Sequence, residues 1–180
     1  SIEYTDYSLR NFFRIVSKSD WYEHTLFIIT SDHNSFGGNL NYFKNCGVYQ
    51  VPVIFYHPGD TTLTGVSDKL IQHTDIFPSV LDYLRINDTI INFGKSIFSE
   101  DKHRFVVNYN SGIYQLIQDN YLYEFNGEKI IGIYHLSDPD EENLVFKKEF
   151  KEVTEYTEML IKAFIQQYNN RIIKDRLVPD

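Results

Sequence analysis

The feature that most constrains this chain is a short apolar segment that ends in Ser31, Asp32 and His33. The β-branched and aromatic residues of this segment predict a fully buried strand over Leu26–Thr30. Ligands and metals bind beside the carboxyl ends of such strands in an open α/β sheet. Asp32 and His33 would therefore offer one oxygen and one nitrogen ligand to a divalent cation at that edge. The alternative is that Asp32 caps the next turn and that His33 is merely exposed.

Composition limits the class of protein. The chain has 180 residues, of which 42% are hydrophobic, and this suits a globular protein with one core or a core plus a small added layer. A net charge of −8 argues against a nucleic-acid surface. The single cysteine, Cys46, excludes an intrachain disulfide framework and a cysteine-rich metal site. No apolar run is long enough to span a bilayer and no signal peptide is recognisable, but the chain opens on Ser1 without an initiator Met, so we expect it to be excised from a longer protein.

The first hundred residues alternate helix and strand patterns. We expect a helix over Tyr7–Ser17 with Asp6 as its N-cap, then a second buried strand over Val51–Tyr56. A second helix over Ile76–Leu84 follows, with Asp75 as its N-cap. This order is typical of a parallel sheet covered by helices, and it predicts an α/β domain over residues 1–100.

The pattern changes at Arg104, where short strands alternate with hairpin turn residues. The turns contain Asn110-Ser111-Gly112, Asp119-Asn120 and Asn126-Gly127, and Asn-Gly is the strongest short hairpin signal. A long helix from Leu144 to about Lys174 follows. Residues 101–180 are therefore predicted to form a small α+β subdomain, a four-stranded antiparallel meander plus a helix. The strands are expected at Phe105–Tyr109, Ile113–Gln118, Tyr121–Phe125 and Ile130–Leu136, and the apolar face of the helix at Phe150, Val153, Leu160, Phe164 and Tyr168.

Three ordered motifs resemble a known family. They are Phe27–His33, Tyr49–Pro58 and His73–Leu84, and the later segment Phe93–Phe98 is similar to a fourth. Together they resemble the C-terminal part of sulfatase-like enzymes of the alkaline phosphatase superfamily, closest to the bacterial lipoteichoic acid synthase and phosphoglycerol transferase branch. The resemblance covers essentially the whole chain. It implies an alkaline-phosphatase-like parallel-sheet domain with a small C-terminal subdomain.

The resemblance also implies a metal site and a reaction. In the family an Asp-His pair completes a site for Mn²⁺, Mg²⁺, Ca²⁺ or Zn²⁺, so Asp32 and His33 are the implied ligands. The implied substrates are phosphate or sulfate esters, for the transferase branch a lipid headgroup, and the reaction passes through a covalent enzyme intermediate. The implied parent is an extracytoplasmic enzyme, periplasmic or on the cell surface, anchored in the cytoplasmic membrane through N-terminal helices.

Half of the implied machinery lies outside this sequence. The family's nucleophile, a Thr or a modified Cys, and another acidic metal ligand precede the Asp-His motif by a long stretch, and nothing in residues 1–31 is placed to be either. Cys46 is followed by Gly47-Val48-Tyr49 and so lacks the Cys-x-Pro-x-Arg context of the modified-cysteine sulfatases. We therefore expect this fragment to be inactive without the N-terminal remainder of the catalytic domain as its partner.

Several other polar residues are candidates for lesser roles. His73 is a candidate for substrate binding, although hydrogen bonding within its own loop is an equal alternative. Asn34 and Ser35 flank the metal motif and are candidates for contacts to substrate or to the metal ligands. His57 is expected to make a turn contact, whereas His24, His103 and His135 are expected on the surface.

Two other functions remain to be weighed. A non-catalytic binding or scaffold domain that retains the fold is the main alternative, and the upstream sequence would discriminate between the two. A serine hydrolase is disfavoured because Ser31, Asp32 and His33 are neighbours on an extended chain and cannot align as a triad. The sequence also lacks a Gly-x-Ser-x-Gly elbow.

Overall fold

The computed structural model describes residues 2–34, 47–101, 103–138 and 142–179. The chain divides into two compact units, Ser1–Ser67 and Asp68–Asp180, and each is described by itself. Within the described residues, no helix combines the length and the apolar character needed to cross a membrane. The expected boundary near residue 100 stays a prediction.

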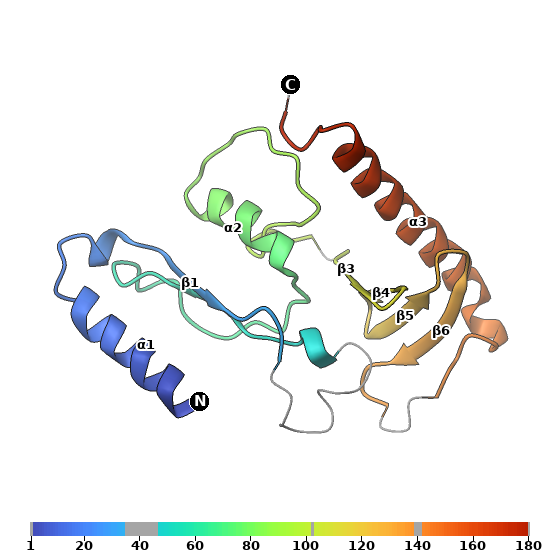
Figure 1. The fold of residues 1–180 in the computed structure, drawn as a ribbon, viewed down its shortest axis with the longest axis horizontal. Helices are drawn as coiled ribbons and strands as arrows, with labels where there is room; N and C mark the ends of the chain where they lie inside the picture. The colour runs from blue at the N-terminus through green and yellow to red at the C-terminus, as the bar shows by residue number, and fades with distance from the viewer. Residues whose placement is uncertain (1, 35–46, 102, 139–141, 180) are drawn as a thin grey trace. The chain divides into compact units, whose positions relative to one another are not determined.

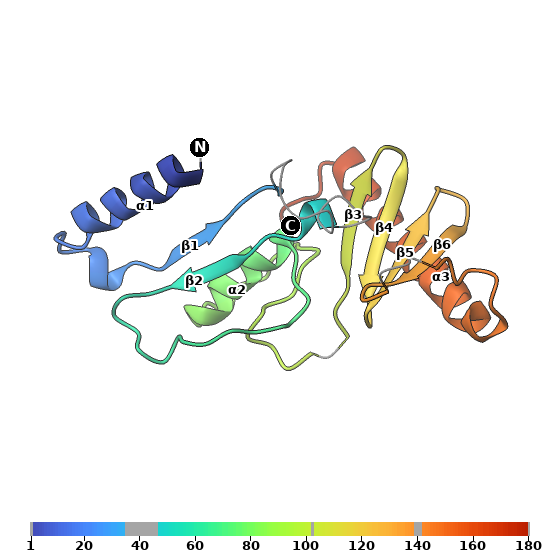
Figure 2. The ribbon, with the colours of Figure 1, turned by 90° about the horizontal axis from the view of Figure 1, so that it is seen from below.

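The first unit packs one helix against a pair of strands (Figure 2). Helix α1 spans Ile2–Val16, and the strands are β1 (Phe27–Thr30) and β2 (Val53–Tyr56). Aromatic rings hold the three elements together, with ring centroids of Phe13 at 5.3 Å from Phe27 and 5.8 Å from Tyr56. The Tyr22 and Tyr56 hydroxyls lie 2.8 Å apart, and this hydrogen bond raises the pKa of Tyr22 to about 12.

Two expectations for this unit are wrong. Strands β1 and β2 pair antiparallel, with Phe27 opposite Tyr56 and Thr30 opposite Val53. A parallel pair needs a crossover connection, usually a helix, whereas the described part of the connection holds only the short 3₁₀ turn Gly47–Tyr49. Asp6 is not an N-cap, because it lies inside α1 and accepts a hydrogen bond from Arg10 one turn later (3.1 Å).

The second unit contains the four-stranded antiparallel meander predicted from its turns. Its strands pair in the order β3-β4-β5-β6. Positive φ angles occur at Ser111, Gly112, Asp119, Asn120 and Gly127, at the turn positions that the sequence marked. The strand bounds are Val106–Asn110, Ile113–Gln118, Tyr121–Phe125 and Ile130–His135, within one residue of those expected.

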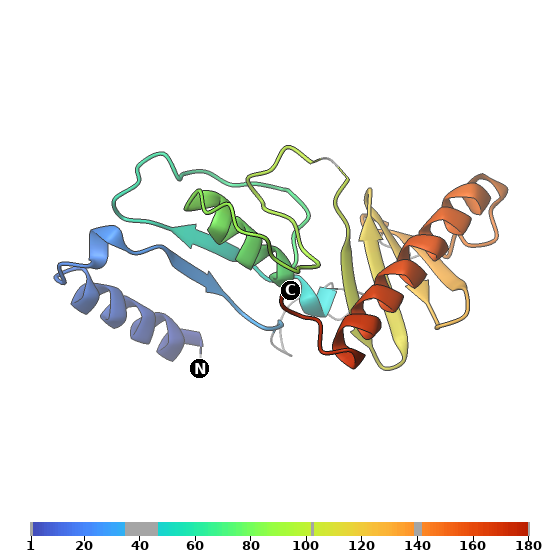
Figure 3. The same ribbon diagram turned by 90° about the horizontal axis from the view of Figure 1, so that it is seen from above.

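Helix α3 (Lys151–Ile173) lies across one face of this meander (Figures 1 and 3). Its buried positions are Thr157 and Ile161, and Ile161 joins the main apolar core. The helix starts seven residues later than expected, after the 3₁₀ turn Lys148–Phe150, and the expected contact residue Val153 is 37% exposed. The core that the helix covers contains Leu116, Tyr123, Phe125, Ile130, Ile133, Leu144 and Ile161.

The remaining elements of the second unit precede the meander. The 3₁₀ turn His73–Asp75 leads directly into helix α2 (Ile76–Tyr83). Ser79 of this helix is fully buried, donates to the carbonyl of Asp75 (2.5 Å) and accepts from the Ile97 amide (3.0 Å). Helix α2 is thereby tied to the segment that follows Phe93.

Candidate metal centre and the Asp75 cluster

Asp32 and His33 follow β1 directly, as the sequence predicts. The carboxylate oxygen Oδ2 of Asp32 lies 3.5 Å from Nε2 of His33, and the two side chains are 85% and 50% exposed. The other carboxylate oxygen accepts the His33 backbone N–H at 2.9 Å. An exposed carboxylate and an imidazole thus hold one oxygen and one nitrogen 3.5 Å apart.

The hydrogen bond of the His33 ring selects the nitrogen that can bind a cation. Nδ1 lies 2.7 Å from the carbonyl oxygen of Asn34. A carbonyl only accepts, so Nδ1 carries the proton and the neutral ring presents its lone pair at Nε2. Imidazoles that bind metals are oriented by this kind of bond.

The distance between the two donor atoms fits one shared cation. Two ligands about 2.1 Å from the same ion, at octahedral or tetrahedral angles, lie about 3.0–3.4 Å apart. The observed 3.5 Å is close to that range. Among the described residues, no group of three or more His, Cys, Asp or Glu side chains comes together, so no third side chain of these types joins the pair there.

Asn34 supports this pair from the next position in the chain. Its side-chain amide donates to the carbonyls of Gly47 and Gln50, both at 2.8 Å, and its backbone N–H donates to Val48 at 2.8 Å. These bonds fix the chain next to His33, whose ring bonds the Asn34 carbonyl. Contact of Asn34 with a substrate stays a prediction, and Ser35 and Cys46 lie outside the described residues.

The remaining histidines are dispersed over both units. His57 makes the expected turn contact, with Nε2 2.9 Å from the Glu23 carbonyl. His24 and His103 are exposed, whereas His135 is half-buried against the ring of Tyr121. His73 is exposed in the second unit, where it begins the 3₁₀ turn His73–Asp75. Its role in substrate binding stays a prediction.

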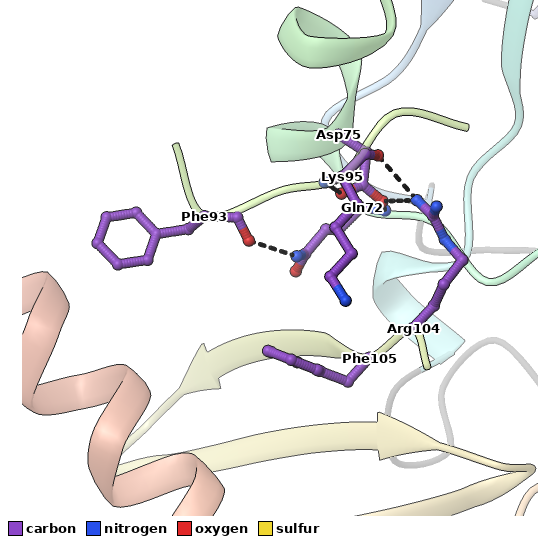
Figure 4. A pocket seen from close by; sticks show the side chains of 6 residues that line it. All are labelled: Gln72, Asp75, Phe93, Lys95, Arg104 and Phe105. Carbon is purple, nitrogen blue, oxygen red and sulfur yellow. Dashed lines mark hydrogen bonds and ion pairs between the residues drawn. The ribbon is translucent and has the colours of Figure 1, made fainter. Parts of the chain in front are cut away.

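Asp75, two residues after His73, is the centre of a buried polar cluster that sequence reasoning missed (Figure 4). The residue is 4% exposed and pairs with Arg104 at 2.9 Å. Its carboxylate also accepts the backbone N–H groups of Gln72 (3.0 Å) and Lys95 (2.7 Å). Asp75 occupies the expected N-cap position of α2, but its side chain makes no capping bond to that helix and instead forms a capping box with Gln72 around the preceding 3₁₀ turn.

All three guanidinium nitrogens of Arg104 donate hydrogen bonds to groups of the same unit. Besides Asp75, it donates to the carbonyls of Leu70, Lys95 and Ser96, at 2.8–2.9 Å. We call Gln72, Asp75, Lys95 and Arg104 the Asp75 cluster. With Phe93 and Phe105 it surrounds a cavity of about 20 Å³, which has room for one water molecule and excludes a larger ligand.

The segment Phe93–Ser96 closes over the His73–Asp75 turn with almost no clearance. A Cβ atom on Gly94 would lie 2.2 Å from the Thr74 carbonyl oxygen and 2.6 Å from the Asp75 nitrogen, so only glycine fits. Phe93 packs against Phe164 and Tyr168 of α3, with centroids 5.3 and 5.5 Å away. Phe93 and Gly94, the first two positions of the motif Phe93–Phe98, therefore each have a packing reason.

Lys95 extends the cluster toward solvent. Its ammonium group donates to the Asp101 carboxylate (2.6 Å) and to the His103 carbonyl (2.9 Å). The bond from Lys95, together with the backbone N–H of His103, lowers the pKa of Asp101. Ser96, the next residue, donates to the Asp82 carboxylate on α2.

Comparisons with known proteins bear on the fold of the chain. A structure of a protein in the alkaline phosphatase superfamily from Vibrio parahaemolyticus superimposes with a TM-score of 0.71 at 16% identity, covering 99% of this chain and 42% of that one. The expected fold class, the C-terminal part of an alkaline-phosphatase-like α/β domain with a long C-terminal helix, is thereby confirmed. The fold is thus similar to that of a protein in the alkaline phosphatase superfamily.

The sequence comparisons narrow the class further. The family model described as Sulfatase matches residues 1–86, which include the whole candidate metal centre and the Asp75 turn. An arylsulfatase of Clostridium perfringens (strain 13 / Type A) is 26% identical over 200 residues, covering 95% of this chain and 39% of the arylsulfatase. Residues 1–86 are thus similar to the sulfatase family, and the chain spans about two fifths of the length of both relatives.

Proposed function

We propose that this chain is the C-terminal part of an enzyme that cleaves or transfers sulfate or phosphate esters with the help of a divalent cation. The observation that carries the proposal is the convergence of Asp32 Oδ2 and His33 Nε2 at 3.5 Å, with the ring nitrogen Nδ1 committed to Asn34. A cation bound there would stabilise negative charge on the transferred group and activate the attacking oxygen. Mn²⁺, Mg²⁺, Ca²⁺ and Zn²⁺ all accept this pair of ligands.

The chain's own residues would bind and orient in this scheme. Asp32 contributes charge, and the hydrogen bond from Nδ1 to Asn34 keeps His33 in the tautomer that leaves Nε2 as an acceptor. His73 and Asn34 are the proposed contacts to substrate. The nucleophile, a Thr or a modified Cys, and the further acidic ligand would come from the N-terminal part of the catalytic domain, so the fragment alone would be inactive.

The substrate class is the finer part of the proposal. The relative's description as an arylsulfatase favours a sulfate ester. The motifs 27–33, 49–58 and 73–84 favour transfer of phosphoglycerol from a lipid headgroup, which would place the parent outside the cytoplasm on a membrane anchor. Both use a tetrahedral anion with the same charge requirement at its oxygens.

Assays on the full-length protein separate these possibilities. Asp32→Asn and His33→Ala are expected to lower turnover about 100-fold or more, whereas His24→Ala, an exposed histidine in the same unit, should leave it unchanged. Nitrophenyl sulfate, nitrophenyl phosphate and phosphatidylglycerol vesicles serve as the substrates. Turnover that survives both ligand variants would refute the metal centre, and absence of turnover on every ester with each cation would favour a non-catalytic scaffold.

A further inference from the structure

The Asp75 cluster surrounds a turn whose outward residues are exposed. His73 and Thr74 both lie on the surface, whereas Asp75, directly behind them, is 4% exposed. The cavity beside the cluster holds no more than a water molecule, so the cluster itself is no substrate pocket. The cluster instead holds the backbone of the turn to which His73 belongs.

Five hydrogen bonds and one close packing contact hold that backbone in place. The Asp75 carboxylate accepts the Gln72 N–H before the turn and the Lys95 N–H from the closing segment. The Gln72 side chain accepts from the Val107 N–H of β3 (3.0 Å) and donates to the Phe93 carbonyl (3.4 Å). The Thr74 carbonyl accepts a hydrogen bond from the side-chain amide of Asn92 (3.0 Å). Gly94 packs so closely against the same carbonyl that a Cβ atom would not fit between them.

Arg104 links the start of the meander to this turn through one carboxylate. It donates to Asp75 and to three carbonyls, so its position is fixed by four bonds in a planar fork. A buried ion pair often contributes little net stability compared with apolar residues of the same volume. The buried ion pair instead favours one arrangement of the chain, because any other arrangement leaves a buried charge unpaired.

We infer that Arg104 is a positioning residue, which acts through Asp75 to hold the His73 imidazole in the place where it meets the ester anion. The inference rests on the proposed function and deepens it, since it gives the C-terminal meander a part in substrate binding. A displacement of about 1 Å in a positioned group lowers turnover up to about 100-fold. Loosening the turn should therefore reduce activity while the exposed imidazole itself is intact.

The test is a double-mutant cycle on the full-length protein, with an aryl sulfate and an aryl phosphate as substrates. Arg104→Lys keeps the charge but cannot form the four-bond fork, and Asp75→Asn removes the charge with little change in shape. We expect each to lower kcat/KM about 10- to 100-fold, and we expect Arg104→Lys to add no further loss in a His73→Ala background. Lys69→Met is the matched control, because Lys69 donates hydrogen bonds to the carbonyls of Ile97 and Ser99, which lie outside the His73–Asp75 turn.

Thermal melting of each variant distinguishes mispositioning from misfolding. An Arg104→Lys variant, which keeps the charge, that melts within a few degrees of the parent but shares the loss of His73→Ala supports the inference. Additive losses in the double variant, or a loss for Lys69→Met as large as that for Arg104→Lys, would overturn it while leaving the substrate role of His73 in place. If His73→Ala has full activity, both the inference and that substrate role are wrong. Asp32→Asn in the same assay reports separately on the metal centre.

Discussion

At the scale of single residues, buried charge and close backbone contact determine the geometry of the second unit. Asp75 and Arg104 have side chains that are only 6% and 8% exposed, and their hydrogen bonds reach four different parts of the chain. Removing one partner of such a pair leaves the other as an uncompensated buried charge. The two residues should therefore depend on each other strongly.

We expect Arg104→Met to lower the free energy of unfolding of this part of the protein by about 3–5 kcal/mol. The double variant Asp75→Leu/Arg104→Met should lose less, because no charge is then buried alone. Urea denaturation followed by circular dichroism measures both. A double variant less stable than Arg104→Met alone would show that the pair contributes more than charge compensation.

Gly94 makes the other critical contact at this scale. Gly94→Ala should lower the free energy of unfolding by about 1–3 kcal/mol or more, since its Cβ would lie 2.2 Å from a backbone oxygen that cannot rotate away. Gly132→Ala is the matched control. Its Cβ would meet the Tyr134 ring, 2.6 Å away, and a side chain can move. Equal losses of stability for the two variants would mean that the segment Phe93–Ser96 can shift to make room for the added Cβ.

At the scale of elements, the meander protects its outer strand β6 with side chains rather than with another strand. Asn143 accepts the Ile133 N–H (3.1 Å) and donates to the Ile131 carbonyl (3.1 Å), while the Glu158 carboxylate accepts the Ile130 N–H (3.3 Å). These bonds occupy edge groups that would otherwise be available to pair with another chain.

Replacement of Asn143 tests this edge. Asn143→Ala should lower the stability of the unit by about 1–2 kcal/mol and should speed amide exchange at Ile133. Asn169→Ala, on the exposed surface of α3, is the control. Unchanged exchange at Ile133 in Asn143→Ala would contradict the assignment of this edge bond.

Glu158 gives the same edge a dependence on pH. The hydrogen bond from Lys162, helped by the Ile130 N–H, lowers the pKa of Glu158 below its ordinary value of 4.5. A lowered pKa in the folded state adds stability above pH 4.5, and this contribution disappears as the pH falls through the folded value. The contribution should be under about 1 kcal/mol because the pair is partly in solvent.

Melting curves of Glu158→Gln between pH 3 and pH 7 measure this contribution. We expect the variant to melt below the parent at pH 7 and the difference to shrink below about pH 4.5. Glu155→Gln, an exposed residue on the same helix, should show no such trend. A difference that stays constant with pH would contradict the assignment.

The elements were predictable where their signal is local. The strands of the meander follow from turn residues such as Asn126-Gly127, whose backbone requirement is met within two or three positions. The antiparallel pairing of β1 and β2 was not predictable, because a buried strand has the same apolar pattern in either pairing. Asp75 lies at the predicted N-cap position, but its side-chain partner was not predictable, because an acidic residue before a helix looks the same in the sequence whether it bonds that helix or Arg104, 29 positions away.

At the scale of the whole molecule, the chain carries a recognisable fold and an incomplete site. It spans about two fifths of its relatives, and its described residues bring one carboxylate and one imidazole together without a third such side chain. The sequence indicated this pair correctly as a strand-end motif, but only the structure shows the 3.5 Å separation and the bond that fixes the His33 tautomer. A sequence does not show distances or hydrogen-bond partners of this kind, because they produce no periodic pattern of residue types.

The most direct test of the metal centre is anomalous diffraction from crystals of the full-length protein soaked with Mn²⁺ or Zn²⁺. We predict a single anomalous peak within about 2.0–2.3 Å of Asp32 Oδ2 and His33 Nε2, which disappears in His33→Ala. A metal bound elsewhere in the protein, with Asp32 and His33 outside its coordination sphere, would contradict the central claim.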